Sequence, residues 1–208
     1  MKRVFMISSF VAGSNVGGSL AMKVLPLLEC ELSLLPTTML GRHPGWGAPG
    51  GGAVSDEMFS GMAEGLVAND VIGTADCIVT GYFASAAQVS EAARLIAAHK
   101  TEGTPVIVDA VMGDFGKGLY VKEEVAAAIV SELLPLADII KSNAWEFWEI
   151  ERRNGHVDAI PEAAREGDAI KSHLAGGDRL SALQFVSSVE HGEAVSYTHL
   201  TLPTIVRV

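Results

Sequence analysis

Short apolar runs alternate with amphipathic segments along most of the chain. The runs lie at residues 3–9, 32–37, 76–81, 105–109, 137–140 and 182–187. Most of them are continuously apolar instead of alternating between apolar and polar residues, which is typical of strands in a parallel sheet that is covered on both faces. We therefore expect each run to be a buried β-strand.

The segments between these runs have helical patterns. Ser85 and Gln88 have the spacing of a capping box, and apolar residues then recur on one helical face as far as Ile96. Further helices are expected at residues 19–28, 55–68 and 122–134. Strands and helices in alternation predict a three-layer α/β/α sandwich with a mostly parallel central sheet. Ligands of such folds bind beyond the carboxyl ends of the strands, so the residues that follow each strand are candidates for the site.

Composition and charge narrow the class of partner. The chain has 208 residues, of which 49% are hydrophobic, and a formal net charge of -10. That charge disfavours binding to nucleic acid, whose phosphate backbone is also negative. No secretory signal or membrane-spanning apolar run is present, so we expect a cytoplasmic protein without a membrane partner. Cys30 and Cys77 match no metal or redox motif and are expected to be buried free thiols.

Two glycine-rich loops are candidates for the substrate side of a site. The loop after the first strand contains Ser8, Ser9 and the small residues 13–19. It could let a ligand approach the backbone closely, or it could be a plain tight turn. Residues 41–52 are mostly glycine and proline, so no helix or packed strand is expected there. This segment is either an exposed loop or a flap that carries His43 and Trp46 over a flat aromatic substrate.

Polar residues after later strands are candidates for a phosphate or metal site. Asp109 and Asp114 could hold a hydrated divalent cation, or Asp109 could cap a turn while Asp114 is solvated. Asn143 and Glu146 could form a capping box, orient a metal–phosphate unit, or do both. Ser187 ends the last predicted strand and could donate a hydrogen bond to a nucleotide phosphate.

These segments resemble the pyridoxal kinases of the ribokinase-like superfamily from residue 1 to about residue 194. The resemblance depends mainly on TGYFASAAQV at 80–89, VDAVMGDFGKGLYV at 108–121 and LLPLADIIKSNAWE at 133–146. It implies transfer of the γ-phosphoryl group of ATP to the 5′-hydroxymethyl group of pyridoxal, pyridoxine or pyridoxamine, with Mg²⁺, in a cytoplasmic homodimer. The alternatives are a non-catalytic protein that binds a B6 vitamer and another ribokinase-like kinase, such as a hydroxymethylpyrimidine kinase or a sugar kinase.

The resemblance also implies roles for individual residues. The pyridine substrate would be bound by Ser9, Thr37, His43, Trp46 and Tyr82. A second group would bind ATP, namely Asp109, Asn143, Glu146 and Ser187, and within it Asp109 and Glu146 would hold the magnesium ion.

The sequence departs from the family pattern in ways that affect the expected activity. Phe10 stands where the family usually has a histidine, and Ala110 and Ser142 replace two expected prolines. The superfamily's G-[TV]-G-D segment, which supplies the catalytic base and an anion hole, does not occur in the 208 residues. We therefore assign no catalytic residue and expect little or no turnover from this chain.

The end of the sequence is unlike the rest. Residues 195–208 are rich in threonine, lack acidic residues and follow no α/β pattern. We expect an incomplete kinase domain at residues 1–194, followed by a tail that derives from a cloning adapter or a frameshift.

Overall fold

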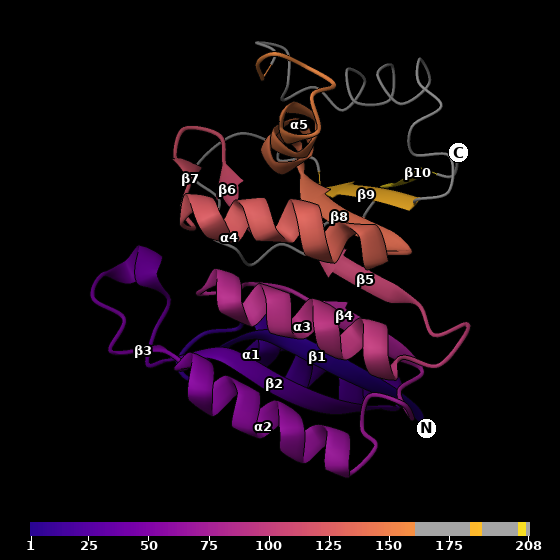
Figure 1. Cartoon of the computed structure of the whole chain (residues 1–208). Helices are drawn as coiled ribbons and strands as arrows, with labels where there is room; N and C mark the ends of the chain where they lie inside the picture. The colour runs from indigo at the N-terminus through magenta and orange to yellow at the C-terminus, as the bar shows by residue number, and fades with distance from the viewer. Residues whose placement is uncertain (161–183, 189–203, 207–208) are drawn as a thin grey trace.

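A computed structural model describes residues 1–160, 184–188 and 204–206 of the chain, with side chains described for residues 1–160. The described strands form one eight-stranded sheet in the order β10-β9-β8-β5-β4-β1-β2-β3 (Figure 1). Their bounds are β1 (Lys2–Val11), β2 (Cys30–Leu40), β3 (Gly51–Ala53), β4 (Cys77–Thr80), β5 (Val106–Asp109), β8 (Ile139–Asn143), β9 (Gln184–Ser188) and β10 (Thr204–Val206). The two edge strands, β3 and β10, pair antiparallel, and all the other neighbours pair parallel.

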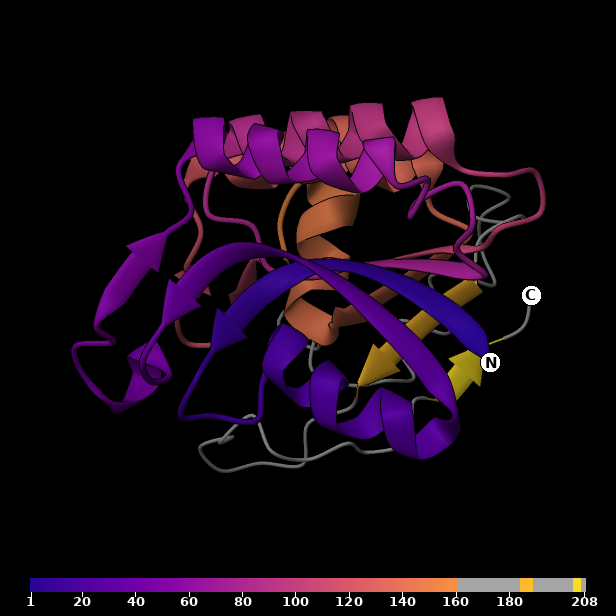
Figure 2. The same ribbon diagram turned by 90° about the horizontal axis from the view of Figure 1, so that it is seen from below.

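Helices cover both faces of the sheet, which gives the three layers that the alternating pattern predicts. The helices are α1 (Gly17–Val24), α2 (Asp56–Ala68), α3 (Ala86–His99), α4 (Glu123–Ala128) and α5 (Ala144–Arg153). Figure 2 shows α2 and α3 on one face of the sheet and α1 on the other. Serine side chains start two of these helices, because Ser55 and Ser85 each accept a hydrogen bond from the backbone N–H three residues later.

The core lies mainly between the central strands and the α2–α3 layer. Phe5, Ile7, Ile78 and Val108 are fully buried on the central strands. A smaller antiparallel hairpin, β6 (Gly113–Asp114) with β7 (Gly118–Leu119), projects beyond the carboxyl end of β5 (Figure 1). Its turn has positive φ angles at Gly116 and Gly118, a conformation that glycine adopts without steric cost.

The order of the central strands identifies one point of the sheet as the expected binding position. From β1 the chain passes through α1 to β2, while the later strands β4, β5 and β8 add in sequence on the other side of β1. The connections therefore reverse direction between β1 and β4. Open α/β sheets bind ligands outside the carboxyl ends of the strands at such a reversal.

Most of the sequence-based expectations for the fold are confirmed. The six expected strands are present, although their bounds differ by a few residues, and the helix expected at 19–28 is an α-helix to Val24 followed by a 3₁₀ turn at Leu25–Leu28. Within the described residues, no helix has the length and apolarity needed to cross a bilayer. The expected domain boundary at residue 194 and residues 195–203 lie outside the described residues.

Two expectations were wrong in detail. Residues 41–52 were expected to contain no helix or packed strand. They include a 3₁₀ turn at Pro44–Trp46, which is the departure, and the start of β3, whose residues are exposed. Both elements lie at the sheet edge, where glycine does not have to pack in a core. Cys30 and Cys77 are free thiols, as expected, but they are half-buried and not buried.

Candidate functional site

Small residues follow the carboxyl ends of β1 and β4, and no larger side chain could replace them without movement. A Cβ atom at Gly81 would lie 2.6 Å from the Ser8 hydroxyl, and one at Gly17 would lie 2.5 Å from the Ser9 hydroxyl. Gly17 also has a positive φ of +52°, which disfavours other residues. Ser9, predicted to bind substrate, is half-buried at this point. The hydroxyls of Ser8 and Ser9 therefore lie close to the two glycines at the carboxyl ends of these strands.

Two predicted substrate residues, Thr37 and Tyr82, contact each other directly. Thr37 is fully buried, and its hydroxyl donates a 2.7 Å hydrogen bond to the backbone carbonyl of Tyr82. Tyr82 is half-buried, and burial raises the pKa of its phenol, so the group stays neutral at physiological pH. Thr37 thus positions the segment that carries Tyr82.

Gln88 is a buried residue of this region for which the sequence suggested only a helix start. Its side-chain amide donates to the carbonyls of Thr37 (3.1 Å) and Val54 (2.9 Å), and its Oε1 accepts from the N–H of Ala84 (3.0 Å). The side chain therefore ties β2, the start of α2 and the segment after β4 together. Its spacing from Ser85 predicted the helix correctly, but it gave no sign of these long-range contacts.

His43 and Trp46 lie together in the loop between β2 and β3. Their ring centroids are 6.1 Å apart at an interplanar angle of 62°, and His43 Nδ1 accepts a hydrogen bond from the N–H of Gly45. Trp46 is 54% exposed. Burial, and secondly the charge of Lys117 on the β6–β7 hairpin, lower the pKa of His43. An imidazole of lowered pKa and an exposed indole in the β2–β3 loop have the chemistry needed to cover an aromatic ring.

Asp109 forms an ion pair with Lys141, a residue that the sequence did not single out. The two residues are opposite each other in the parallel β5–β8 pairing, and the Lys141 Nζ atom lies 3.0 and 2.9 Å from the two carboxylate oxygens. Burial raises the pKa of the Asp109 carboxyl, and Lys141 opposes that effect. No local pattern could have revealed the pair, because it depends on the register of two strands 32 residues apart.

Asn143 and Glu146 form the capping box that was one interpretation of their spacing. Asn143 Oδ1 accepts from the N–H of Glu146, and Glu146 Oε2 accepts from the N–H of Asn143, each at 2.8 Å. The Asn143 amide also donates to the carbonyl of Gly113 at 2.8 Å. The pair therefore starts α5 and fixes the β6–β7 hairpin to it.

The second oxygen of Glu146 is also occupied by protein donors. Oε1 accepts from the N–H of Met112 at 3.0 Å and lies 3.5 Å from both the N–H of Gly113 and the hydroxyl of Tyr120. The side chain is buried, and burial, with the charge of Asp109 as the next cause, raises its pKa to about 8. Glu146 thus joins the segment after β5, the hairpin and the start of α5 in one hydrogen-bonded unit.

The two predicted magnesium ligands already have protein partners in this arrangement. A metal ion would have to compete with Lys141 at Asp109 and with backbone N–H donors at Glu146. Asp114, the other acidic candidate, accepts a hydrogen bond from the N–H of Phe115 in the hairpin turn. In the part of the chain that the structure describes, no three His, Cys, Asp or Glu side chains cluster as a metal site.

Ser187, predicted to contact nucleotide phosphate, lies on β9. Its backbone pairs with Ser142 of β8, next to Asn143, so Ser187 also lies near the carboxyl ends of the strands. Its hydroxyl lies outside the described side chains.

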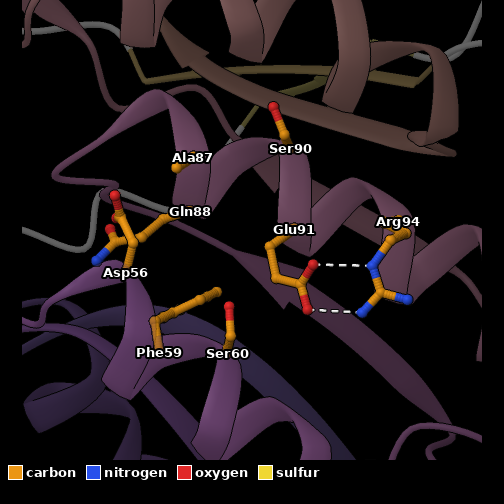
Figure 3. Close-up of a pocket in the computed structure, with 8 residues that line it drawn as sticks. All are labelled: Asp56, Phe59, Ser60, Ala87, Gln88, Ser90, Glu91 and Arg94. Atoms are coloured by element: carbon orange, nitrogen blue, oxygen red, sulfur yellow. Dashed lines mark hydrogen bonds and ion pairs between the residues drawn. The ribbon is translucent and has the colours of Figure 1, made fainter.

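A separate pocket of about 300 Å³ lies in the outer helical layer (Figure 3). Its lining belongs to α2 and α3, and consists of Asp56, Phe59, Ser60, Ala87, Gln88, Ser90, Glu91 and Arg94. The ion pair between Glu91 and Arg94 forms part of its wall. Of these residues, Gln88 also contacts the substrate side of the candidate site, through its hydrogen bond to the carbonyl of Thr37.

Curated proteins with similar sequences are kinases of B6 vitamers. The chain is 28% identical to a pyridoxal kinase of Deinococcus radiodurans, over 83% of this chain and 58% of that protein. It is 33% identical to a pyridoxine/pyridoxal/pyridoxamine kinase of Bordetella avium, over 78% of this chain and 56% of that protein. The match to a pyridoxal kinase of Pasteurella multocida, at 29% identity, covers 91% of this chain and 65% of that protein. The chain thus spans between 56% and 65% of the length of these three relatives. No protein-family model matches it.

Solved structures with the same fold agree with this relationship. The pyridoxal kinase of Leishmania donovani in complex with ADP and pyridoxine superposes with a TM-score of 0.73 at 28% identity, over 92% of this chain and 64% of that chain. The pyridoxal kinase of Entamoeba histolytica with PLP gives a TM-score of 0.68 at 27% identity, over 89% of this chain and 64% of that chain. A protein of Bacteroides thetaiotaomicron described as a phosphomethylpyrimidine kinase reaches 0.75 at 18% identity, over 91% of this chain and 63% of that chain, which shows the fold alone.

Proposed function

Since the chain belongs to the pyridoxal kinase family, we propose that the protein transfers the γ-phosphoryl group of ATP to the 5′-hydroxymethyl group of pyridoxal or a related B6 vitamer. The observation that carries the proposal is the grouping of the predicted residues at the carboxyl ends of the strands. Ser9, Tyr82, Asp109 and Asn143 all lie at or just beyond the carboxyl ends of neighbouring parallel strands. An open α/β sheet binds its ligands just beyond the carboxyl ends of its strands.

On the substrate side, the proposal gives each group a specific task. Ser9 donates a hydrogen bond to the pyridine substrate, and Tyr82 lies alongside the ring, held by the Thr37 hydroxyl. His43 and Trp46 cover the ring from the β2–β3 loop. A flat aromatic ring suits contacts of this kind, because stacking adds to the burial of apolar surface.

On the phosphate side, we propose that Asp109, Asn143, Glu146 and Ser187 surround the ATP phosphates. Glu146 contributes by holding the backbone of Met112 and Gly113 in place, as its hydrogen bonds indicate. Magnesium would accompany the nucleotide phosphates, since magnesium keeps several waters and binds few protein groups directly.

We also propose that turnover needs a general base and an anion hole that these 208 residues do not contain, because no G-[TV]-G-D segment occurs in them. The second candidate function is a protein that binds a B6 vitamer without phosphorylating it. The domain boundary at residue 194, the cytoplasmic location and the homodimer stay predictions.

Calorimetric titration of the 208-residue chain with pyridoxal, hydroxymethylpyrimidine and ribose tests the substrate class. We expect pyridoxal to bind most tightly, and we expect the W46F variant to bind it roughly three- to tenfold more weakly, because phenylalanine covers the ring with less area. Clear preference for hydroxymethylpyrimidine or ribose would overturn the assignment.

Sequencing the source DNA across codon 194 separates the two candidate functions. A continuation that encodes G-x-G-D in place of residues 195–208 supports the kinase, and that longer protein should then form pyridoxal 5′-phosphate from pyridoxal and ATP. Confirmation of the printed sequence, together with pyridoxal binding and no product, supports a binding protein.

A further inference from the structure

Lys141 occupies the position at Asp109 where a metal ion would have to bind. Its ammonium lies 2.9 and 3.0 Å from the two oxygens of Asp109, so both oxygens face one cation. The side chain of Lys141 is 46% exposed, while that of Asp109 is 27% exposed. The pair is thus at the boundary between the sheet and the solvent in front of it, and not in the core.

The register of β5 and β8 determines where the pair points. Val108 and Ile140 are paired neighbours and are both buried. Side chains alternate between the two faces of a strand, so Asp109 and Lys141 lie together on the face opposite to Val108 and Ile140. The pair is also at the carboxyl ends of both strands, where the proposed function places the nucleotide phosphates.

The charge of Lys141 also reaches the second predicted metal ligand. Burial, and next the charge of Asp109, raise the pKa of Glu146 to about 8, and the charge of Lys141 opposes that rise. A divalent cation at Asp109 would meet the like charge of the ammonium at close range, and both carboxylate oxygens already contact that ammonium.

We propose that Lys141 is the resident cation of this site: its ammonium neutralises Asp109 and excludes a divalent metal ion from it when no nucleotide is bound. The inference rests on the proposed function in one respect, namely that the ligand that brings phosphate to the site is a nucleotide. A lysine ammonium suits the role because it is a compact charge on a flexible stem, able to turn toward phosphate oxygens when these arrive.

The simple alternative is an ordinary cross-strand ion pair that stabilises the sheet. Opposite charges on neighbouring strands commonly serve that purpose. The two interpretations differ in one measurable property. A structural pair makes no difference to metal binding, whereas a resident cation prevents it.

The test uses Mn²⁺ alone, titrated into the 208-residue chain without nucleotide and followed by electron paramagnetic resonance of the free ion. We expect the K141M variant, which keeps a similar stem without the charge, to bind Mn²⁺ at least tenfold more tightly than the unchanged chain. The K141R variant, which keeps the charge, should bind Mn²⁺ as weakly as the unchanged chain. The D109N/K141M double variant should lose the gain, because the newly freed carboxylate is gone.

Equal Mn²⁺ affinity in K141M and the unchanged chain would overturn the proposal, and so would a gain that persists in the double variant. Circular dichroism shows whether each variant folds, and K141Q, which also lacks the charge, takes the place of K141M if K141M does not fold: unchanged Mn²⁺ affinity in K141Q would contradict the exclusion, and a gain would support it. The same proteins are also titrated with pyridoxal, which tests the proposed function separately. The Mn²⁺ result does not depend on which vitamer binds, so either proposal can fail without the other.

Discussion

At the scale of single residues, the substrate side depends on buried polar groups that connect segments distant in sequence. Gln88 is 1% exposed and makes three hydrogen bonds to backbone atoms from its side chain. Thr37 is buried beside it and holds Tyr82. Buried donors and acceptors of this kind are costly to leave unpaired, so these side chains contribute both stability and a fixed position for the site.

Replacing Gln88 with leucine tests this contribution. The Q88L variant keeps a similar volume but leaves the Ala84 N–H and the Val54 carbonyl without their partner. We expect the free energy of unfolding in urea to fall by about 2–4 kcal/mol. The control is S90A on the same helix, for which we expect a change within roughly 0.5 kcal/mol. Equal stability of the two variants would contradict the role of Gln88.

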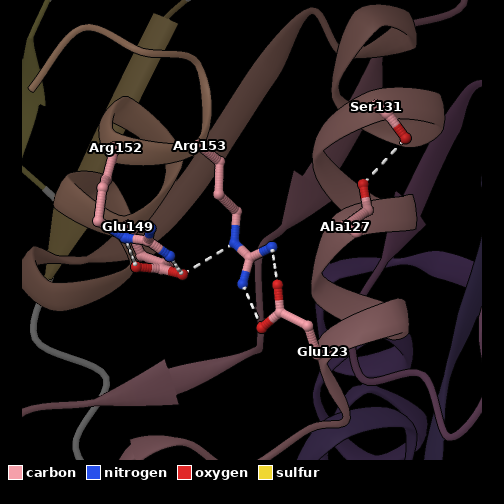
Figure 4. A network of polar contacts seen from close by, with 6 residues as sticks. All are labelled: Glu123, Ala127, Ser131, Glu149, Arg152 and Arg153. Carbon is pink, nitrogen blue, oxygen red and sulfur yellow. Dashed lines mark hydrogen bonds and ion pairs between the residues drawn. The ribbon is translucent and has the colours of Figure 1, made fainter. Parts of the chain in front are cut away.

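At the scale of the elements, α5 is joined to the start of α4 by a network of charges (Figure 4). Glu149 accepts hydrogen bonds from Arg152 and Arg153, and Arg153 also donates two hydrogen bonds of 2.8 Å to Glu123. The Glu149 side chain is 4% exposed. Burial alone would raise its pKa, but hydrogen bonds and charges of the two arginines outweigh burial and hold the pKa below the usual value.

The pH dependence of stability should report this network. A carboxyl whose pKa is depressed on folding stabilises the protein above its unfolded pKa, and that stability is lost as the pH falls through the folded pKa. We expect the E149Q variant to lose about 1–2 kcal/mol of unfolding free energy at pH 7. The difference from the unchanged chain should shrink as the pH falls below 4.5, the ordinary value for the group.

Urea unfolding of both proteins between pH 7 and pH 3 gives this comparison. The matched control is E124Q, because Glu124 is an exposed residue of α4 whose partner Lys122 lies 3.8 Å away. Its effect should stay within about 0.5 kcal/mol at every pH. A difference for E149Q that is constant across the pH range would show that the charge of Glu149 is not the cause.

At the scale of the whole molecule, apolar side chains are exposed beside α1. Leu27 and Leu28 are 82% and 65% exposed in the 3₁₀ turn that follows the helix, and Met22 is 50% exposed on α1 itself. Neighbouring apolar side chains on a surface often mark a place where another chain binds. These residues are consistent with the homodimer that the family resemblance implies.

Sedimentation equilibrium of a double variant, L27S/L28S, tests this interface. We expect the unchanged chain to form dimers and the variant to be monomeric at the same concentration, because the variant removes apolar surface from the contact. Met58 provides the control, since it is 58% exposed on α2, on the opposite face of the sheet, and M58S should still dimerise. A monomeric unchanged chain, or a dimeric double variant, would contradict the prediction.

Features of this protein that depend on neighbours in the sequence could be predicted from the sequence by itself. The apolar runs identified the central strands, and the Ser85 and Asn143 caps were recognised because a cap and its partner are three residues apart. The edge strand β3 and the β6–β7 hairpin were missed. Both are two- or three-residue pairings in glycine-rich segments, where no hydrophobic periodicity exists.

The contacts that define the site were decided by the tertiary structure. Thr37 bonds to a residue 45 positions away, and Lys141 meets Asp109 across 32 positions. Strand order and register bring these pairs together, and a shift of one residue would turn Lys141 to the other face of the sheet. The sequence could therefore indicate which residue types follow each strand, but the partner of each side chain depends on long-range packing of the whole sheet.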